Sequence, residues 1–190
     1  KDVLGRYFLV GAAMNVDQIW NRTPDETNVV KNNFNSIVAE NCMKGEEIHP
    51  EENRFFWDDA DRFVKFGQDN GLAIIGHCLV WHSQPPVWMF TDERGDTVSR
   101  DVLIDRMHRH ISAVVGRYKG RILGWDVVNE IFNDDGTFRN SSYYRIIGPE
   151  FVELAFKFAH EADPNAELYI NDYSLAKPAK RDAVCRIVRE

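Results

Sequence analysis

The sequence has few cysteines and no excess of basic residues. Its three cysteines, Cys42, Cys78 and Cys185, form no CxxC pair and are too few for a disulfide framework. Cys42 and Cys78 lie in apolar, strand-like surroundings, so we expect buried, unreactive thiols. With 23 Lys and Arg against 30 Asp and Glu, the formal net charge is −7. This charge disfavours nucleic acids and anionic membranes as partners, because phosphate groups are bound by basic faces, whereas a neutral substrate is compatible with it.

Long apolar runs and several signature motifs are also absent. No run approaches the roughly 18 apolar residues that a membrane helix requires, so we expect no membrane span. Lys1 does not open a signal peptide, so we expect any such peptide to be already removed or to lie outside this sequence. The sequence has no HExxH pair, no GxSxG elbow, and no match to the dinucleotide fingerprint at residues 11–15. These absences argue against zinc proteases, serine hydrolases and dinucleotide enzymes.

Strand and helix signals alternate along all 190 residues, which are enough for one domain with a sizeable core. Short apolar runs rich in β-forming residues begin about 30 to 50 residues apart, the spacing of βαβ units with a crossover helix. The predicted strands are residues 7–13, 36–39, 72–80, 122–128 and 167–170.

Helix signals fill the gaps between these strands. Thr23, Pro24 and Glu26 combine a capping box with a proline at the first helical position, which predicts a helix running toward Phe34. Apolar residues at three- and four-residue steps predict further helices. One such helix follows Trp57, a second is capped by Ser99 and a third opens at Pro149. A fourth begins near Pro178 and continues to Glu190.

The predicted strands are nearly apolar on both faces, as expected for parallel strands covered by helices. This pattern fits either an open doubly wound sheet or part of a β/α barrel. Because no glycine-rich phosphate loop follows the first strand, the barrel is favoured. A complete (β/α)8 TIM barrel typically needs roughly 250 residues, so the chain is predicted to hold about its first five β/α units.

Polar side chains gather where four successive predicted strands end. In a β/α barrel these carboxyl ends share one rim, and active sites lie at that rim. Each cluster taken alone is at least as well explained as the start of a solvated loop or a helix cap. Four such clusters in succession favour a functional site. They are Glu40-Asn41 with Lys44, His77 with Trp81 and Gln84, Asn129-Glu130, and Asn171-Asp172-Tyr173.

Two of these residues carry specific expectations. His77 lies among apolar neighbours, where an unpaired polar group would be costly, so we expect it to have a partner. Glu130 follows a buried strand directly, and a carboxyl group beside apolar walls has a raised pKa. Such a group can stay protonated near neutral pH and act as the general acid of glycoside hydrolysis. The alternative is that Glu130 caps a helix or pairs with a Lys or Arg.

Four segments of the sequence resemble the conserved motifs of glycoside hydrolase family 10, in the order and at the spacing of that family. The resemblance covers nearly the whole chain. The segments are residues 40–44 (ENCMK), 76–84 (GHCLVWHSQ), 125–130 (WDVVNE) and 169–173 (YINDY).

This resemblance implies a retaining endo-β-1,4-xylanase on a (β/α)8 barrel that uses neither metal nor cofactor. We expect it to be secreted and to act outside the cell, at the cell surface or in the periplasm. Glu130 matches the family's acid/base, and Asn129 matches its contact to the sugar 2-hydroxyl at the cleavage point. The remaining matches are to substrate-binding residues. On the glycone side these are Glu40, Asn41 and Lys44, around the cleavage site His77, Trp81 and Gln84, and on the leaving-group side Asn171 and Tyr173.

The sequence departs from the family pattern in three places. Cys42 and Cys78 stand where Ala, Glu or Thr is expected, and Pro86-Val87-Trp88 replaces a more usual polar residue before the Trp. Most importantly, the nucleophilic Glu of the family lies on the seventh strand, and the sequence reaches only the fifth β/α unit. We therefore expect residues 1–190 to be the N-terminal part of a single catalytic domain. Its partners would be xylan, xylo-oligosaccharides and the C-terminal half of the barrel, on the same or a separate chain.

Two alternatives remain open on the sequence alone. The chain could be a non-catalytic sugar-binding fragment. It could also belong to a Schiff-base aldolase that uses Lys44, since the barrel architecture supports that chemistry. The position of Lys44 beside Glu40 in a rim rich in sugar-binding residue types disfavours the aldolase.

Overall fold

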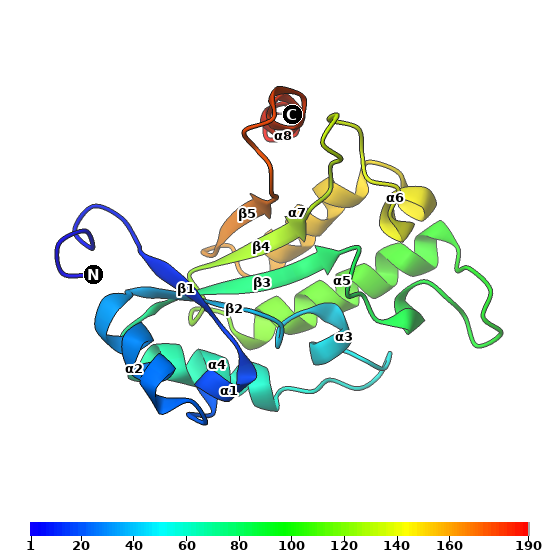
Figure 1. The fold of residues 1–190 in the computed structure, drawn as a ribbon. Helices are drawn as coiled ribbons and strands as arrows, with labels where there is room; N and C mark the ends of the chain where they lie inside the picture. Colours follow the sequence, from blue (N-terminus) through cyan, green and yellow to red (C-terminus); the bar gives the residue numbers. More distant parts are fainter. Residues whose placement is uncertain (190) are drawn as a thin grey trace.

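Five parallel strands form the centre of the computed structural model, which describes residues 1–189 (Figure 1). The strands pair in sequence order, β1-β2-β3-β4-β5, so each β/α unit adds its strand beside the preceding one. The strands are β1 (Gly11–Met14), β2 (Ser36–Ala39), β3 (Ala73–Trp81), β4 (Gly124–Asn129) and β5 (Glu167–Asn171).

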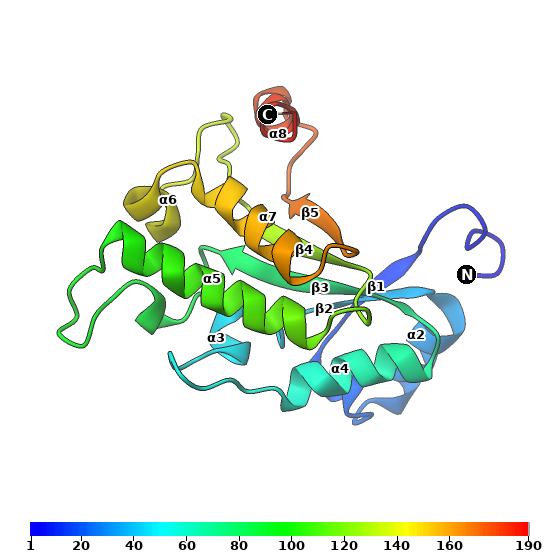
Figure 2. The ribbon, with the colours of Figure 1, turned by 180° about the vertical axis from the view of Figure 1, so that it is seen from behind.

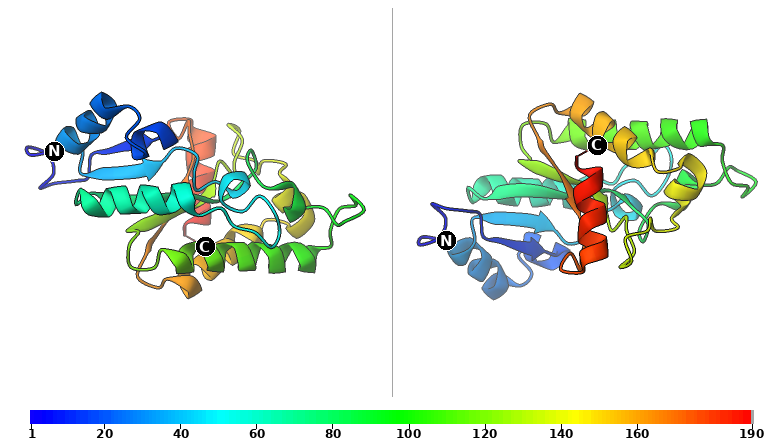
Figure 3. Two further views of the ribbon diagram at one scale, coloured as in Figure 1. Left: turned by 90° about the horizontal axis from the view of Figure 1, so that it is seen from below. Right: turned by 90° about the horizontal axis from the view of Figure 1, so that it is seen from above.

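Helices connect the strands, and the three longest pack against one face of the sheet (Figure 2). These are α4 (Asp58–Asp69), α5 (Arg100–Arg117) and α7 (Phe151–Ala162). A further helix, α8 (Pro178–Ile187), follows β5 and lies beyond that strand (Figures 1 and 3). The shorter helices are α1 (Val16–Ile19), α2 (Pro24–Asn33), α3 (Gly45–Ile48), the 3-10 turn η1 (Val87–Met89) and α6 (Ser142–Ile147).

The core lies between the sheet and the long helices. Ile74 of β3, Phe63 of α4 and Leu103 of α5 are almost completely buried there. Trp125 of β4 is also buried, and it lies against the backbone of Gly76 in β3. A Cβ atom at position 76 would stand 2.1 Å from the Trp125 ring, so only glycine allows this strand pair to hold the indole.

Four of the five predicted strands are confirmed to within two residues, and β2 has the predicted bounds. The first was wrong over residues 7–10, which lie outside β1. Tyr7 and Phe8 donate their backbone N–H groups to Leu4, and Val10 donates to the Asn35 side chain. Because local turns and a side chain take up these groups, the ladder with β2 begins only at Gly11.

The predicted helix starts are largely confirmed, with two corrections. The α2 helix begins at Pro24 as expected, but the Thr23 side chain forms no capping hydrogen bond, so the predicted capping box was wrong. Ser99 does cap α5. The helix that starts at Pro178 ends at Ile187 and does not continue further, and Glu190 lies outside the described residues. Within residues 1–189, no helix has the length and apolar composition that a membrane crossing requires.

Candidate active site

The carboxyl ends of β3, β4 and β5 bring three predicted site residues into one row. Trp81 pairs with Asn129 in the register of β3 and β4, and Asn129 pairs with Asn171 in the register of β4 and β5. The Asn171 amide also donates to the Asn129 side-chain oxygen at 2.9 Å. The parallel topology therefore gathers the predicted residues at one edge of the sheet, as the sequence pattern indicated.

Glu130 stands directly after β4 and is held at its backbone and at its carboxylate. Its backbone N–H donates to the Asn171 carbonyl at 2.9 Å, and its own carbonyl accepts from Arg139 Nε at 2.9 Å. The Trp81 indole N–H donates to Glu130 Oε2 at 3.1 Å. Glu130 has φ +54°, a left-handed conformation that is uncommon for a residue with a side chain and occurs often at functional sites.

Lys44 and Trp81 meet next to this carboxylate. The Lys44 ammonium lies 4.6 Å from the centre of the Trp81 ring, within the range of a cation–π contact. It also donates to the Asn41 side-chain oxygen at 2.8 Å, and the Lys44 residue is buried. This arrangement leaves the ammonium engaged by two neighbours and offers no observation in favour of a Schiff-base role.

His77 has the partner that its apolar surroundings required. Its Nδ1 lies 2.8 Å from Asp126 Oδ2, and both side chains are mostly buried. A carboxylate at Nδ1 fixes which ring nitrogen carries the proton and turns Nε2 away from Asp126. Asp126 lies on β4, four residues before Glu130, and its carboxylate is engaged by His77.

The remaining predicted residues lie around this group. The Tyr173 hydroxyl accepts a hydrogen bond from Arg139 Nη2 at 3.0 Å, and Tyr173 is half exposed. Gln84 donates to Glu46 of α3 at 2.8 Å, so its amide is directed toward α3 in this structure. Glu40 is exposed at the end of β2. The contacts thus join Glu130, Trp81, Lys44, Asn41, Asn129, Asn171 and Tyr173 into one cluster.

Arg139, His82 and Lys180 belong to the same region and were not predicted as site residues, and Lys180 pairs with Asp172 of the predicted strand-end cluster. Lys180 Nζ lies 2.7 Å from Asp172 Oδ1, both side chains are fully buried, and the ammonium also lies 3.8 Å from the Tyr173 ring centre. Burial and the nearby Arg139 guanidinium lower the pKa of His82. Arg139 and Lys180 could not be predicted from the residues at the strand ends, because each reaches the rim from a later segment. His82 could have been predicted in that way, because it follows Trp81 directly.

Cys42 and Cys78 are buried, as predicted for unreactive thiols. Burial raises the pKa of Cys42 to about 12 and raises the pKa of Cys78 as well. Neither thiol is therefore ionised near neutral pH, so neither is nucleophilic there.

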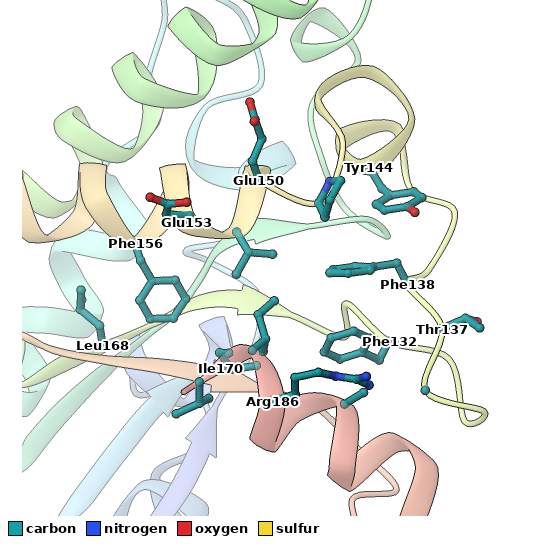
Figure 4. Close-up of a pocket in the computed structure, with 16 residues that line it drawn as sticks. Phe132, Thr137, Phe138, Tyr144, Glu150, Glu153, Phe156, Leu168, Ile170 and Arg186 are labelled. Atoms are coloured by element: carbon teal, nitrogen blue, oxygen red, sulfur yellow. The ribbon is translucent and has the colours of Figure 1, made fainter. Parts of the chain in front are cut away.

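A cavity lies away from this cluster, between α7, β5, α8 and the segment between β4 and α6 (Figure 4). It has a volume of about 920 Å³. Figure 4 shows Phe132, Phe138 and Tyr144 along one side and Phe156 and Ile170 along another. Its walls are mainly apolar, and Glu130 and its partners do not line it, so the cavity marks incomplete cover over β5 and contributes no site chemistry.

Comparison with known proteins agrees with this geometry. Residues 1–190 match the sequence model of glycosyl hydrolase family 10. The endo-1,4-β-xylanase A of Xylanibacter ruminicola is 62% identical over 190 residues, which are 100% of this chain and 52% of that protein. The chain spans about half the length of that protein and of the endo-1,4-β-xylanase B of Paenibacillus barcinonensis, and 15% to 28% of several longer relatives.

Solved structures give the same result at the level of the fold. A GH10 endoxylanase from a sugarcane soil metagenome superposes with a TM-score of 0.96 at 41% identity, covering 100% of this chain and 55% of that one. The intracellular xylanase TsXylA of Thermoanaerobacterium saccharolyticum, described in complex with xylotetraose, superposes with a TM-score of 0.94 at 38% identity. That match covers 99% of this chain and 60% of TsXylA. The chain therefore belongs to glycosyl hydrolase family 10, and its five β/α units are the N-terminal part of the TIM barrel of that family.

Proposed function

We propose that the protein containing this chain is a retaining endo-1,4-β-xylanase that hydrolyses internal linkages of xylan, with Glu130 as its acid/base. The observation that carries this proposal is the position of Glu130. A buried strand delivers its carboxylate to the rim, where Trp81 donates to it and amide side chains flank it. Relatives named endo-1,4-β-xylanase, among them the 62% identical protein of Xylanibacter ruminicola, support xylan as the substrate.

In this proposal Glu130 acts twice. As a general acid it donates its proton to the oxygen of the leaving sugar while a second carboxylate attacks the sugar carbon. As a general base it then takes a proton from the water that hydrolyses the glycosyl-enzyme intermediate. A retaining mechanism places the two carboxyl groups only about 5.5 Å apart. The family resemblance assigns the second one to the seventh strand, beyond the five units of this chain.

Two other acids near the rim are unsuited to the role of nucleophile. Asp126 is bound to His77, and Asp172 forms a buried ion pair with Lys180. A carboxylate engaged in this way would have to give up its partner in order to attack a sugar carbon. These contacts favour a nucleophile contributed by the other half of the barrel.

The other rim residues are proposed to bind the sugar chain. Asn129 contacts the 2-hydroxyl at the cleavage point, and Asn171 orients the Asn129 amide through their mutual hydrogen bond. Glu40, Asn41 and Lys44 bind the glycone side, His77, Trp81 and Gln84 surround the cleavage site, and Tyr173 faces the leaving group. For Gln84, this role requires the amide to leave Glu46 when substrate binds.

We also propose that residues 1–190 form one catalytic domain together with the C-terminal half of the barrel, and that the enzyme is secreted. Cell fractionation with an activity assay tests secretion. Activity confined to the cytoplasm would contradict it.

The proposed role of Glu130 is tested with Glu130→Gln in a complete barrel that contains this chain. Activity on xylan and on aryl xylosides with poor leaving groups should fall by roughly 10²- to 10⁴-fold, the usual contribution of general acid catalysis. Cleavage of the glycosidic bond in aryl xylosides with very acidic leaving groups should change far less, because these leave without protonation. Measured in the pre-steady state, equal loss on both classes of substrate would exclude Glu130 as the acid.

A further inference from the structure

The segment after Glu130 folds back on itself and returns a second side chain to the same place. Phe132 and Phe138 pair in an antiparallel bridge, and Arg139 donates its backbone N–H to the Ile131 carbonyl. The turn of this hairpin depends on Gly136, which has φ +82°, and on Asp135, whose carboxylate accepts from the backbone N–H of Thr137. Asp-Gly at a turn is a frequent hairpin signal, so the local sequence itself directs position 139 back toward position 130.

The Arg139 guanidinium donates from two different nitrogen atoms, one to the segment after β4 and one to the segment after β5. Its Nε donates to the Glu130 carbonyl at 2.9 Å, and its Nη2 donates to the Tyr173 hydroxyl at 3.0 Å. Tyr173 follows β5, whereas Glu130 follows β4. The planar guanidinium has donors in fixed directions, so one side chain sets the distance between both segments.

The Glu130 backbone needs such support. Its left-handed conformation is unfavourable for a residue with a side chain and persists only where neighbours impose it. The neighbours are the Asn171 carbonyl on the N–H side and Arg139 on the carbonyl side. Because φ and ψ of Glu130 set the direction of its Cα–Cβ bond, these two contacts aim the carboxyl group.

We propose that Arg139 is a positioning residue for proton transfer, because it holds the Glu130 backbone in the conformation that directs the carboxyl group toward the leaving-group oxygen. This inference rests on the proposed function, in which Glu130 is the acid. Arg139 touches neither carboxylate oxygen of Glu130 in this structure, so its effect passes through the backbone.

The experiment compares Arg139→Met and Arg139→Lys with the unchanged enzyme in a complete barrel that contains this chain. Misplacing a catalytic group by about 1 Å can cost roughly 100-fold in rate. We expect Arg139→Met to lower kcat about 10- to 100-fold on substrates with poor leaving groups, with KM nearly unchanged. Glycosidic cleavage of a dinitrophenyl xylobioside should fall less than about threefold. Arg139→Lys should recover part of the loss, since an ammonium can reach one of the two acceptors but not both.

Arg145→Met is the matched control. Arg145 is an exposed residue of α6 that contacts only the Asn140 carbonyl and the Ser142 hydroxyl in the described hydrogen-bond network, and its loss should change neither substrate class. Equal loss on both substrate classes in Arg139→Met, together with a lowered Tm, would show a structural role and overturn the proposal. A raised KM at unchanged kcat would overturn it in favour of direct substrate binding, and unchanged kinetics would also overturn it.

Glu130→Gln, measured in parallel, separates this proposal from the proposed function. If Glu130→Gln shows the leaving-group dependence and Arg139→Met does not, the inference about Arg139 fails and the assignment of Glu130 stands. If Glu130→Gln loses both substrate classes equally, the assignment of Glu130 fails and the inference about Arg139 fails with it.

Discussion

β4 and β5 end in similar polar residues, but their surroundings differ. β4 pairs with β3 and β5, and five of its six residues are buried. Within residues 1–189, β5 pairs with β4 alone, and none of its five residues is buried. The outer face of β5 borders the large cavity under α8 (Figure 4).

This difference shows which part of the site these 190 residues can hold rigidly by themselves. Asn129 ends β4 and Glu130 comes directly after it, and β4 is hydrogen-bonded to a neighbouring strand on each side. Asn171 and Tyr173 follow from a strand whose other edge has unpaired backbone groups, and such edges favour pairing with a further strand. The residues that follow β4, including the proposed acid/base Glu130, are thus better supported than the residues that follow β5, Asn171 and Tyr173.

The largest expected difference between the two strands is in stability. In a complete barrel, Trp125→Ala should lower the free energy of unfolding by about 3–5 kcal/mol, because it leaves a large void in a closed core. Ile170→Ala on β5 should cost less than half of that, since Ile170 already borders a cavity. Urea denaturation measures both. Equal losses would mean that the complete protein fills the cavity and that β5 is as well covered as β4.

Low pH should destabilise the fold first on the helix-covered face of the sheet, where α5 packs. His110 of α5 is fully buried, and its Nδ1 lies 3.1 Å from His49 Nδ1. Burial, with a smaller contribution from His49, lowers the pKa of His110 to about 3. Because the folded pKa lies below the unfolded value near 6.5, this contribution to stability is complete above about pH 6.5 and is lost as the pH falls toward 3.

The loss should reach about 2–4 kcal/mol at pH 4, and denaturant melts from pH 7 to pH 4 measure it. The comparison variant is His110→Gln, which keeps a polar side chain but does not titrate. It should flatten the acid limb of the stability profile, even if its stability at pH 7 is lower. An acid limb of unchanged slope would show that His110 is not the responsible group.

A smaller effect is expected at Trp81, which belongs to the rim of β3. Trp81→Ala should weaken xylo-oligosaccharide binding by about 1–2 kcal/mol through lost stacking and contact area, with part of the effect from the loss of its hydrogen bond to Glu130. Calorimetry on a complete barrel measures the affinity. Unchanged affinity with a collapsed Tm would assign Trp81 to the core and remove it from the site.

The sequence predicted the features that depend on local periodicity and topology. Strand spacing and apolar runs located the sheet, and parallel topology brought the strand-end residues to one rim. The expected partner of His77 was found in Asp126. Burial of a polar group creates this demand for a partner whatever the rest of the fold, which is why the prediction succeeded.

Features that depend on returning segments were missed. Arg139 reaches Glu130 only because the hairpin folds back, and Lys180 reaches Asp172 from the helix after β5. The capping box predicted at Thr23 failed for a different, local reason. The backbone of Thr23 has φ −120° and ψ 73°, and its side chain forms no capping hydrogen bond. Short helices such as α3 and α6 are too brief to show a helical period.

The central claim is that this chain carries the acid/base half of a two-carboxylate site. A reducing-sugar assay on mass-verified residues 1–190, with and without a polypeptide that supplies the C-terminal half of the barrel, tests it most directly. We predict no measurable xylan hydrolysis by residues 1–190 alone, and activity when the halves reassemble. Robust turnover by residues 1–190 alone would contradict the claim, because a second catalytic carboxylate would then have to lie within this chain.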